Sequence, residues 1–231
     1  MTVPLLGCYL WFWGHEWVPR PSKPSGPLTM AEAREVNAAI PFVDGPVAPA
    51  RRYWFKGSPA AKLQATDCLA TAALYEAGTD ERGQKAVMQV VINRLRHPGY
   101  PGTVCGVVYQ GSFRKTGCQF SFTCDGSRDR RRIRDGWEAA RRLARRVLDG
   151  EVFPDVGTAT HYHTDWIVPY WSGSLDKVAQ VGTHIFYRRR RGEGASQTRV
   201  GGPGETRTPD AHIRNVALYP AELRDHAVPL A

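Results

Sequence analysis

The strongest constraint on the fold is a helical pattern that runs from about residue 81 to residue 96. Four apolar residues recur at the spacing that places them on one face of an α-helix, namely Val87, Val90, Val91 and Leu95. Gly83 lies near the start of the pattern, and Pro98 ends it. A helix with one apolar face needs other elements to bury that face, so the pattern predicts a packed domain around it.

Other periodic segments predict the elements that cover this helix. A preceding helix is expected to begin at Asp67, whose carboxylate can cap the first turn, and to end before Gly78. A third helix fits residues 134–148. "TATHYHTDW" alternates as a strand does and "HIFYR" is expected to pair with it, whereas "YPGTVCGVVYQG" and "GCQFSFTCDG" predict loops with brief strands. The predicted fold class is α+β, mostly helical, with a small antiparallel β element.

Composition divides the chain into three parts. Its 231 residues, 42% of them apolar, suit one domain with flanking segments. Residues 1–62 combine an apolar start with a Pro-rich linker and an arm expected to lie on the domain, and residues 63–191 hold the patterned domain. Residues 192–231 are polar and glycine-rich, which predicts a disordered tail. The apolar start lacks a basic region and is too short to span a bilayer, so a truncated export signal is one interpretation.

Two peptides in the tail suggest an unusual origin. "TRTPD" can be encoded by the reverse complement of a T-loop sequence of transfer RNA genes, and "YPAEL" by the reverse complement of a D-arm sequence. We interpret the tail from about Gly201 as read-through into an antisense transfer RNA gene, with a natural disordered tail as the alternative. The nucleotide sequence distinguishes the two.

The chain is basic, but unevenly so. Lys and Arg outnumber Asp and Glu by 31 to 22, which gives a net charge of +9 and suits polyanionic partners such as nucleic acid, anionic lipid or wall polymer. Much of the excess lies in residues 128–134 and 188–191, where solvated loops are the simpler explanation. No motif that reads nucleic acid accompanies these residues, so nucleic acid is not expected as a partner.

Four of the five cysteines fall inside the patterned domain, namely Cys68, Cys105, Cys118 and Cys124. An even number is compatible with two disulfides, for which three connectivities exist, and spacing alone does not choose among them. Five residues separate Cys118 from Cys124, which disfavours a structural zinc site. Oxidised pairs would place the domain outside the cytosol.

Several motifs in order resemble a known family. "DCLATAALYEAG", "GQKAVMQVVINRLRHPGYPGTVCGVVYQGS", "GCQFSFTCDG", "GTATHYHTDWIVPYW" and "VGTHIFYR" resemble the catalytic domain of the spore-cortex-lytic type of cell-wall hydrolase (SleB/CwlJ-like). The resemblance covers about residues 67–188. It implies a lysozyme-related domain that cleaves the glycan strands of peptidoglycan, usually as a lytic transglycosylase, and it places the catalytic glutamate on Glu76.

Physical chemistry supports Glu76 independently of the resemblance. A carboxyl group near a helix C-terminus meets the negative end of the helix dipole, and burial by its neighbours further disfavours its ionisation. Both effects raise its pKa, so the group can keep a proton near neutral pH and donate it to a glycosidic oxygen. In a transglycosylase one carboxyl group suffices, because it then removes the proton of the muramic acid C6 hydroxyl as an anhydro ring closes. Asp80 and Glu81 are imperfect counterparts of a second glutamate of the family.

Substrate contacts are expected from polar and aromatic side chains that stack on sugars and hydrogen-bond their hydroxyl groups. A first set lies on glycine-flanked loops, namely Tyr109, Gln110, Gln119, Phe120 and Ser121. A second set follows the predicted strand, namely His161, Tyr162, His163, Asp165 and Trp171. His161 and His163 lie two residues apart and would share one face of that strand.

Two alternatives remain from the residues alone. His161 and His163 with Asp165 or His184 could hold zinc in a metal-dependent wall amidase, although no H-E-x-x-H helix is present. A wall-binding module without catalysis would use the basic surface and the aromatic residues. The preferred hypothesis remains glycan cleavage without cofactor or metal, by a monomer whose partner is peptidoglycan. Its expected location is the cell envelope, the periplasm or the exterior, with peripheral membrane association as an open point.

Overall fold

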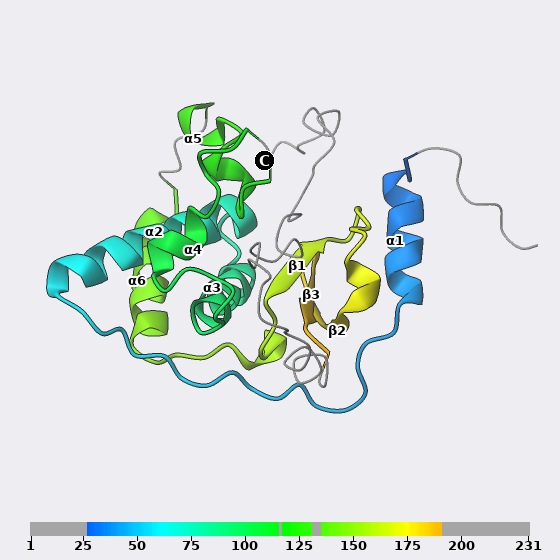
Figure 1. The fold of residues 1–231 in the computed structure, drawn as a ribbon, viewed down its shortest axis with the longest axis horizontal. Helices are drawn as coiled ribbons and strands as arrows, with labels where there is room; N and C mark the ends of the chain where they lie inside the picture. The colour runs from blue at the N-terminus through cyan, green and yellow to red at the C-terminus, as the bar shows by residue number, and fades with distance from the viewer. Residues whose placement is uncertain (1–26, 116, 131–134, 191–231) are drawn as a thin grey trace, which may run out of the picture.

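The computed structural model describes residues 27–115, 117–130 and 135–190 (Figure 1). In chain order the helices and strands are α1 (Met30–Ala39), α2 (Pro59–Ala77), α3 (Glu81–Leu95), α4 (Val104–Val108), α5 (Ser127–Arg130), α6 (Trp137–Leu148), β1 (His161–Thr164), β2 (Asp176–Val181) and β3 (His184–Arg188). Three single turns of 3-10 helix join them at Ser121–Thr123, Pro154–Val156 and Ser172–Ser174. The predicted class, helix-rich α+β with a small antiparallel sheet, is confirmed. The interpretations of the apolar start and of the tail fall outside the described residues.

Helix α2 begins earlier than its sequence pattern predicts. Ser58 caps it, because the hydroxyl Oγ accepts a hydrogen bond from the backbone N–H of Ala61 at 3.2 Å, and Pro59 opens the first turn. The predicted start at Asp67 is wrong. That residue lies within the helix, where its carboxylate instead accepts a hydrogen bond from Arg141 Nε at 2.7 Å. The helix ends as expected at Gly78, whose φ of 54° lies in the range that favours glycine.

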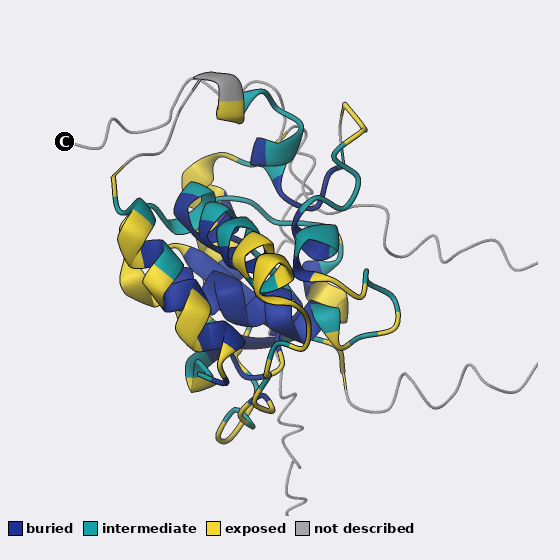
Figure 2. Cartoon of the chain, turned by 90° about the vertical axis from the view of Figure 1, so that its left-hand side faces the viewer, coloured by how far each residue is buried: buried dark blue, intermediate teal, exposed yellow. Residues whose placement is uncertain are grey.

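Helix α3 confirms the strongest sequence prediction and lies between the two parts of the core. Asp80 caps it by accepting a hydrogen bond from Arg82 N at 3.0 Å. Its residues Val87 and Val91 pack with α2, α4 and α6, whereas Ala86 and Val90 pack with β2 and β3. Buried residues accordingly gather in the interior between the helices and the sheet (Figure 2). Helix α3 therefore ties the helical layer to the sheet.

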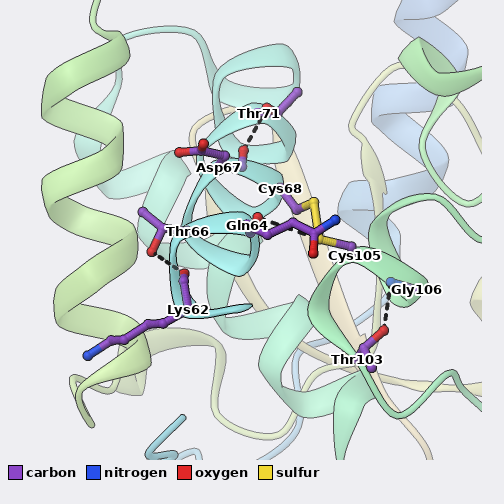
Figure 3. The surroundings of a disulfide bond; sticks show 9 residues. All are labelled: Lys62, Gln64, Thr66, Asp67, Cys68, Thr71, Thr103, Cys105 and Gly106. Atoms are coloured by element: carbon purple, nitrogen blue, oxygen red, sulfur yellow. Dashed lines mark hydrogen bonds between the residues drawn. A yellow bond between two sulfur atoms is a disulfide. The ribbon is translucent and has the colours of Figure 1, made fainter. Parts of the chain in front are cut away.

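The segments predicted to hold brief strands are helical instead. Helix α4 is capped by Thr103, whose hydroxyl accepts a hydrogen bond from Gly106 N at 3.1 Å, and "GCQFSFTCDG" contains a turn of 3-10 helix. The pairing left open by the sequence is Cys68 with Cys105, and Cys118 with Cys124. The first disulfide joins α2 to α4 (Figure 3), so the short valine-rich helix is held against the longer one.

Helix α6 packs its apolar side on α2 and α3. Its buried residues recur at helical spacing, namely Ala140, Leu143, Ala144, Val147 and Leu148. The helix begins at Trp137, whereas the pattern predicted a start at residue 134, and residues 131–134 lie outside the described part.

The sheet has three antiparallel strands in the order β1-β3-β2. The predicted pairing of "HYHT" with "HIFYR" is confirmed, with Tyr162 opposite Phe186. Strand β2 was not predicted. Its pairing with β3 shifts register between Lys177 and Ala179, and that irregularity disturbs the alternation by which a strand is recognised.

The segment before α2 lies along the domain and contains an unexpected helix. Helix α1 falls within residues 1–62, which the composition predicted as linker and arm, and the boundary predicted at residue 62 falls inside α2. Further along, Phe55 N donates to Leu148 O at 2.8 Å, which fixes the segment to the end of α6. Gly150 has a φ of 99°, and a Cβ atom there would lie 2.9 Å from Trp54 Nε1. None of the helices in the described parts combines the length and the apolar character needed to cross a lipid bilayer.

Candidate active site

A small cavity of about 40 Å³ opens where α2, α3 and the sheet meet. Its lining comes from the ends of α2 and α3, the start of the 3-10 turn at Ser121 and the loop before it, the strands β1 and β3, and the segment that follows β1. The residues that line it are Glu76, Arg94, Gln119, Ser121, Tyr162, His163, Thr164, Ile167, Pro169, Trp171 and His184. Polar and aromatic side chains thus surround the carboxyl group singled out in the sequence.

Glu76 lies in the last turn of α2 with its side chain half-buried at this cavity. The hydroxyl of Tyr162 donates a hydrogen bond to Glu76 Oε2 at 2.9 Å. Burial raises the pKa of Glu76 to about 7, against the opposing effects of the Tyr162 hydrogen bond and of the positive charge of Arg94, while Asp125 adds a smaller upward effect. Glu76 is therefore an acid that still holds its proton in much of the population near neutral pH.

Arg94 is a buried guanidinium beside Glu76, with only 1% of its surface exposed. Its Nε donates to the carbonyl oxygen of Thr160 at 2.7 Å. With the Gln119 amide oriented to satisfy both groups, the Gln119 oxygen accepts from Arg94 Nη1 at 2.9 Å and from Nη2 at 3.2 Å. The guanidinium carbon also lies 6.0 Å from the centre of the Tyr162 ring. Arg94 thereby contacts the residue that orients Glu76.

Two histidines of the cavity are uncharged near neutral pH. Burial lowers the pKa of His163 to about 4 and that of His184 to about 4. His163 Nδ1 lies 2.9 Å from the carbonyl oxygen of Thr164, which can only accept, so Nδ1 carries the proton. Its Nε2 then accepts from the hydroxyl of Tyr187 at 2.9 Å. Protein groups therefore occupy both ring nitrogens of His163.

The histidine pair of the sequence does not form a metal site among the described residues. His161 does not line the cavity: its Nδ1 lies 2.9 Å from Thr160 Oγ1, and its ring packs 5.3 Å from the Trp171 ring. In the described ranges, no three His, Cys, Asp or Glu side chains are placed to hold a metal ion together. Since Nε2 of His163 already accepts a hydrogen bond, the arrangement does not favour the zinc amidase alternative.

The structure brings together about half of the predicted site. Of the predicted contact residues, the cavity wall includes Gln119, Ser121, Tyr162, His163 and Trp171. Three predicted contacts on the glycine-flanked loops lie elsewhere, namely Tyr109, Gln110 and Phe120. Tyr109 packs edge-on against Phe122, Gln110 pairs through its carbonyl with Gln119 N at 2.9 Å, and Phe120 is buried in the helical core.

Neither predicted second carboxylate reaches the cavity. Asp80 caps α3, and Glu81 is exposed and pairs with Lys85 at 2.8 Å. Asp165, expected beside the histidines, pairs with Arg34 at 3.2 Å, and its charge also acts to raise the pKa of His163 and of His184 against the larger effect of burial. The carboxylate that acts electrostatically on Glu76 is Asp125, which directly follows Cys124.

Sequence reasoning missed four residues of the cavity wall, namely Arg94, Thr164, Ile167 and Pro169. The sequence pattern could have identified Arg94, because it lies seven residues after Val87 and therefore falls on the apolar face of α3. A charged residue at a buried helical position is often functional. The other three lie on and just after β1, and their place at the cavity depends on how the following loop folds back.

Known proteins resemble this chain over its central part. The sequence model of a family described as Cell Wall Hydrolase matches residues 78–187, beginning two residues after Glu76. The spore cortex-lytic enzyme of Halalkalibacterium halodurans is 30% identical over 110 residues, which cover 45% of this chain. The same alignment spans 28% of the length of that relative.

Two solved structures are also similar. The catalytic domain of the Bacillus cereus SleB protein shares 23% identity with a TM-score of 0.44, over 58% of this chain and 95% of that one. The catalytic domain of the germination-specific lytic transglycosylase SleB from Bacillus anthracis shares 24% identity with a TM-score of 0.44, over 58% of this chain and 99% of that one. Over residues 78–187 the chain is thus similar to the cell wall hydrolase family.

Proposed function

We propose that the chain cleaves the glycan strands of peptidoglycan and that Glu76 is the general acid. The observation that carries the proposal is the position of Glu76, half-buried at a cavity, with a pKa raised to about 7 and with Tyr162 hydrogen-bonded to it. The match of residues 78–187 to the cell wall hydrolase family and the name of the spore cortex-lytic relative support the choice of substrate.

The hydrogen bond from Tyr162 assigns the two carboxyl oxygens different tasks. Because the Tyr162 hydroxyl donates to Oε2, the acidic proton of Glu76 belongs on Oε1, which is left for the substrate. In the first step Glu76 transfers that proton to the glycosidic oxygen as the bond to the muramic acid C1 breaks. The departing sugar leaves with a hydroxyl group, and positive charge develops on the remaining ring.

The second step returns the proton to the enzyme. The Glu76 carboxylate removes the proton of the muramic acid C6 hydroxyl as its oxygen attacks C1, which closes the anhydro ring. In that interval Tyr162 and Arg94 stabilise the carboxylate, since both favour its charged form. This lytic transglycosylase path needs one carboxyl group and fits a cavity that Asp80 and Glu81 do not reach.

Analysis of the products tests the proposed reaction. Purified peptidoglycan is incubated with the protein, with and without a chelator, and the soluble fragments are measured by mass spectrometry. We expect anhydro-muropeptides whose yield is insensitive to the chelator. Hydrated muropeptides would point to a muramidase in place of a transglycosylase, and new amino termini lost with the chelator would overturn glycan cleavage in favour of amide hydrolysis.

The substrate also sets the proposed location. Peptidoglycan lies outside the cytoplasm, so we place the working enzyme in the cell envelope or the exterior. The two disulfides suit such an oxidising compartment. Peptidoglycan is the proposed partner, and no role is assigned to nucleic acid.

Tyr162→Phe is expected to change both the rate and its pH dependence. The hydrogen bond from Tyr162 lowers the pKa of Glu76, so its loss raises that pKa and moves the alkaline fall of activity to higher pH. At pH 6, where Glu76 is protonated in both proteins, loss of its orientation should reduce the rate about tenfold. Initial rates of fragment release between pH 5 and pH 9 provide the measurement. Tyr170→Phe, which changes an exposed ring outside the cavity wall, is the control and should keep the wild-type pH profile. If Tyr162→Phe also had the rate and pH profile of the wild type, the proposed role of Tyr162 would be disproved.

A further inference from the structure

One part of the cavity wall is held in place by a helix that lies outside the family match. Ile167, Pro169 and Trp171, which follow β1, line the cavity. The side chain of Asn37 on α1 reaches the backbone of this segment and donates from Nδ2 to the carbonyl oxygens of Asp165 at 2.7 Å and of Ile167 at 2.8 Å. Both hydrogens of the amide are thereby used, and Asn37 is only 1% exposed.

Helix α1 is itself fixed to the sheet by a buried lysine. Lys177 on β2 is 4% exposed, and its Nζ donates to the carbonyl oxygens of Asn37 at 2.7 Å and of Ile40 at 2.9 Å. These carbonyls lie at the C-terminal end of α1, where a positive charge is favourable. Just beyond them, Val43 N donates to Lys177 O at 2.9 Å. Figure 1 shows α1 next to the sheet, on the side away from α2 and α6.

The other polar contact between α1 and the segment is weaker. Arg34 pairs with Asp165 at 3.2 Å, but about half of the arginine side chain is exposed. Its guanidinium also lies 5.9 Å from the centre of the Trp166 ring. Exposed ion pairs contribute little because solvent screens them, whereas loss of the two partly buried hydrogen bonds of Asn37 would deprive two carbonyl groups of their donor.

We propose that Asn37 is a positioning residue of the substrate-binding cavity, acting through the carbonyl groups of Asp165 and Ile167 to fix the segment that bears Ile167, Pro169 and Trp171. The inference rests on the proposed function, because the cavity is taken to bind glycan. It assigns to helix α1, which lies N-terminal to the cell wall hydrolase match, a part in substrate binding and none in proton transfer.

The experiment distinguishes a positioning role of Asn37 from a role in overall stability and from a role in proton transfer. Asn37→Ala, Asn37→Ser and, as the matched control, Glu35→Ala on the exposed side of the same helix are compared with the wild-type chain. Hydrogen exchange is followed by mass spectrometry, and kcat and KM are measured with soluble glycan strands prepared from peptidoglycan. We expect Asn37→Ala to speed exchange at residues 165–171 and not in α2 and α3, and to raise KM about tenfold. The pH at which kcat falls should stay that of the wild type, because Glu76 is untouched.

The remaining variants and outcomes decide the inference. Asn37→Ser keeps one donor and should give a smaller rise in KM, and Glu35→Ala should match the wild type. Faster exchange throughout the domain in both Asn37 variants would show a general structural role and overturn the inference, as would unchanged KM with faster exchange at 165–171. A wild-type chain that releases no fragments from peptidoglycan would instead refute the proposed function, and the exchange pattern would then still report whether Asn37 fixes this segment.

Discussion

Replacing Glu76 with glutamine is expected to lower the rate of glycan cleavage about a thousandfold, which is the usual scale of general acid catalysis. The amide has nearly the shape of the carboxylic acid, but it cannot transfer a proton to the glycosidic oxygen. Fragment release from purified peptidoglycan, quantified by mass spectrometry, gives the rate. Glu138→Gln, an exposed glutamate on α6 that pairs with Arg141, serves as the control and should retain wild-type activity.

The same variant carries an internal check on its fold. The pKa of Glu76 is raised from 4.5 to about 7, so between these values the folded state binds more protons than the unfolded state. The stability of the wild type therefore falls as the pH rises from 4.5 to about 7. Glutamine has no charge to bury, so above pH 7 Glu76→Gln should be more stable than the wild type. Wild-type cleavage rates in this variant would remove Glu76 from the mechanism, whereas lost activity with lost stability would point to misfolding.

Removal of the Cys68–Cys105 disulfide is the second large expected effect. The bond closes a loop of 37 residues, for which loop-closure entropy gives a stabilisation of about 4 kcal/mol. Cys118 and Cys124 are only 6 residues apart, and the same relation gives about 2 kcal/mol for their bond. Urea unfolding of the two paired Cys→Ala variants should therefore rank the first bond above the second. Equal losses would show that loop length does not set the contribution of these bonds.

The sequence alone predicted those elements whose apolar periodicity and end residues indicate the same structure. Helix α3 has a regular apolar face, an acidic cap in Asp80 and a proline after its end, and it was predicted almost to the residue. The pairing of β1 with β3 followed from alternation in two short segments. These features depend on residues within one helical turn or one strand, and sequence patterns carry information on structure over this range.

The missed elements depend on contacts that are distant along the chain. The valines of α4 favour a strand by propensity, but packing against α2 and the disulfide to Cys68 hold them in a helix. Pro59 falls within the segment predicted as linker and arm, whereas after Ser58 it occupies the first turn of α2, a position where proline is tolerated. Helix α1 has little apolar surface of its own, and Asn37 and Lys177 fix it through polar contacts that no local pattern reveals.

The sequence indicated the carboxyl group at the cavity, but only part of the set of residues around it. Glu76 was predicted as the acid because the C-terminal end of a helix disfavours a negative charge, and Glu76 does lie at the cavity. Tyr162, which hydrogen-bonds to Glu76, lies 86 positions away in the sequence. Tyr162 was predicted to contact the substrate, and its contact with Glu76 was not predicted. Arg94 was overlooked because it follows an apolar pattern that was interpreted only as core. Distances between segments, which decide these roles, are set by the packing of α3 against the sheet.

The order of the strands has a consequence for the making of this protein. Strand β3 lies between β1 and β2, although it is the last described strand to emerge during translation. A nascent polypeptide that stops short of residue 184 has no central strand on which to align the other two. Tyr162, which faces Phe186 across that pairing, can settle beside Glu76 only afterwards. We therefore expect Glu76 to acquire the Tyr162 hydrogen bond only when synthesis of the domain is complete, and chains released before residue 184 to lack it.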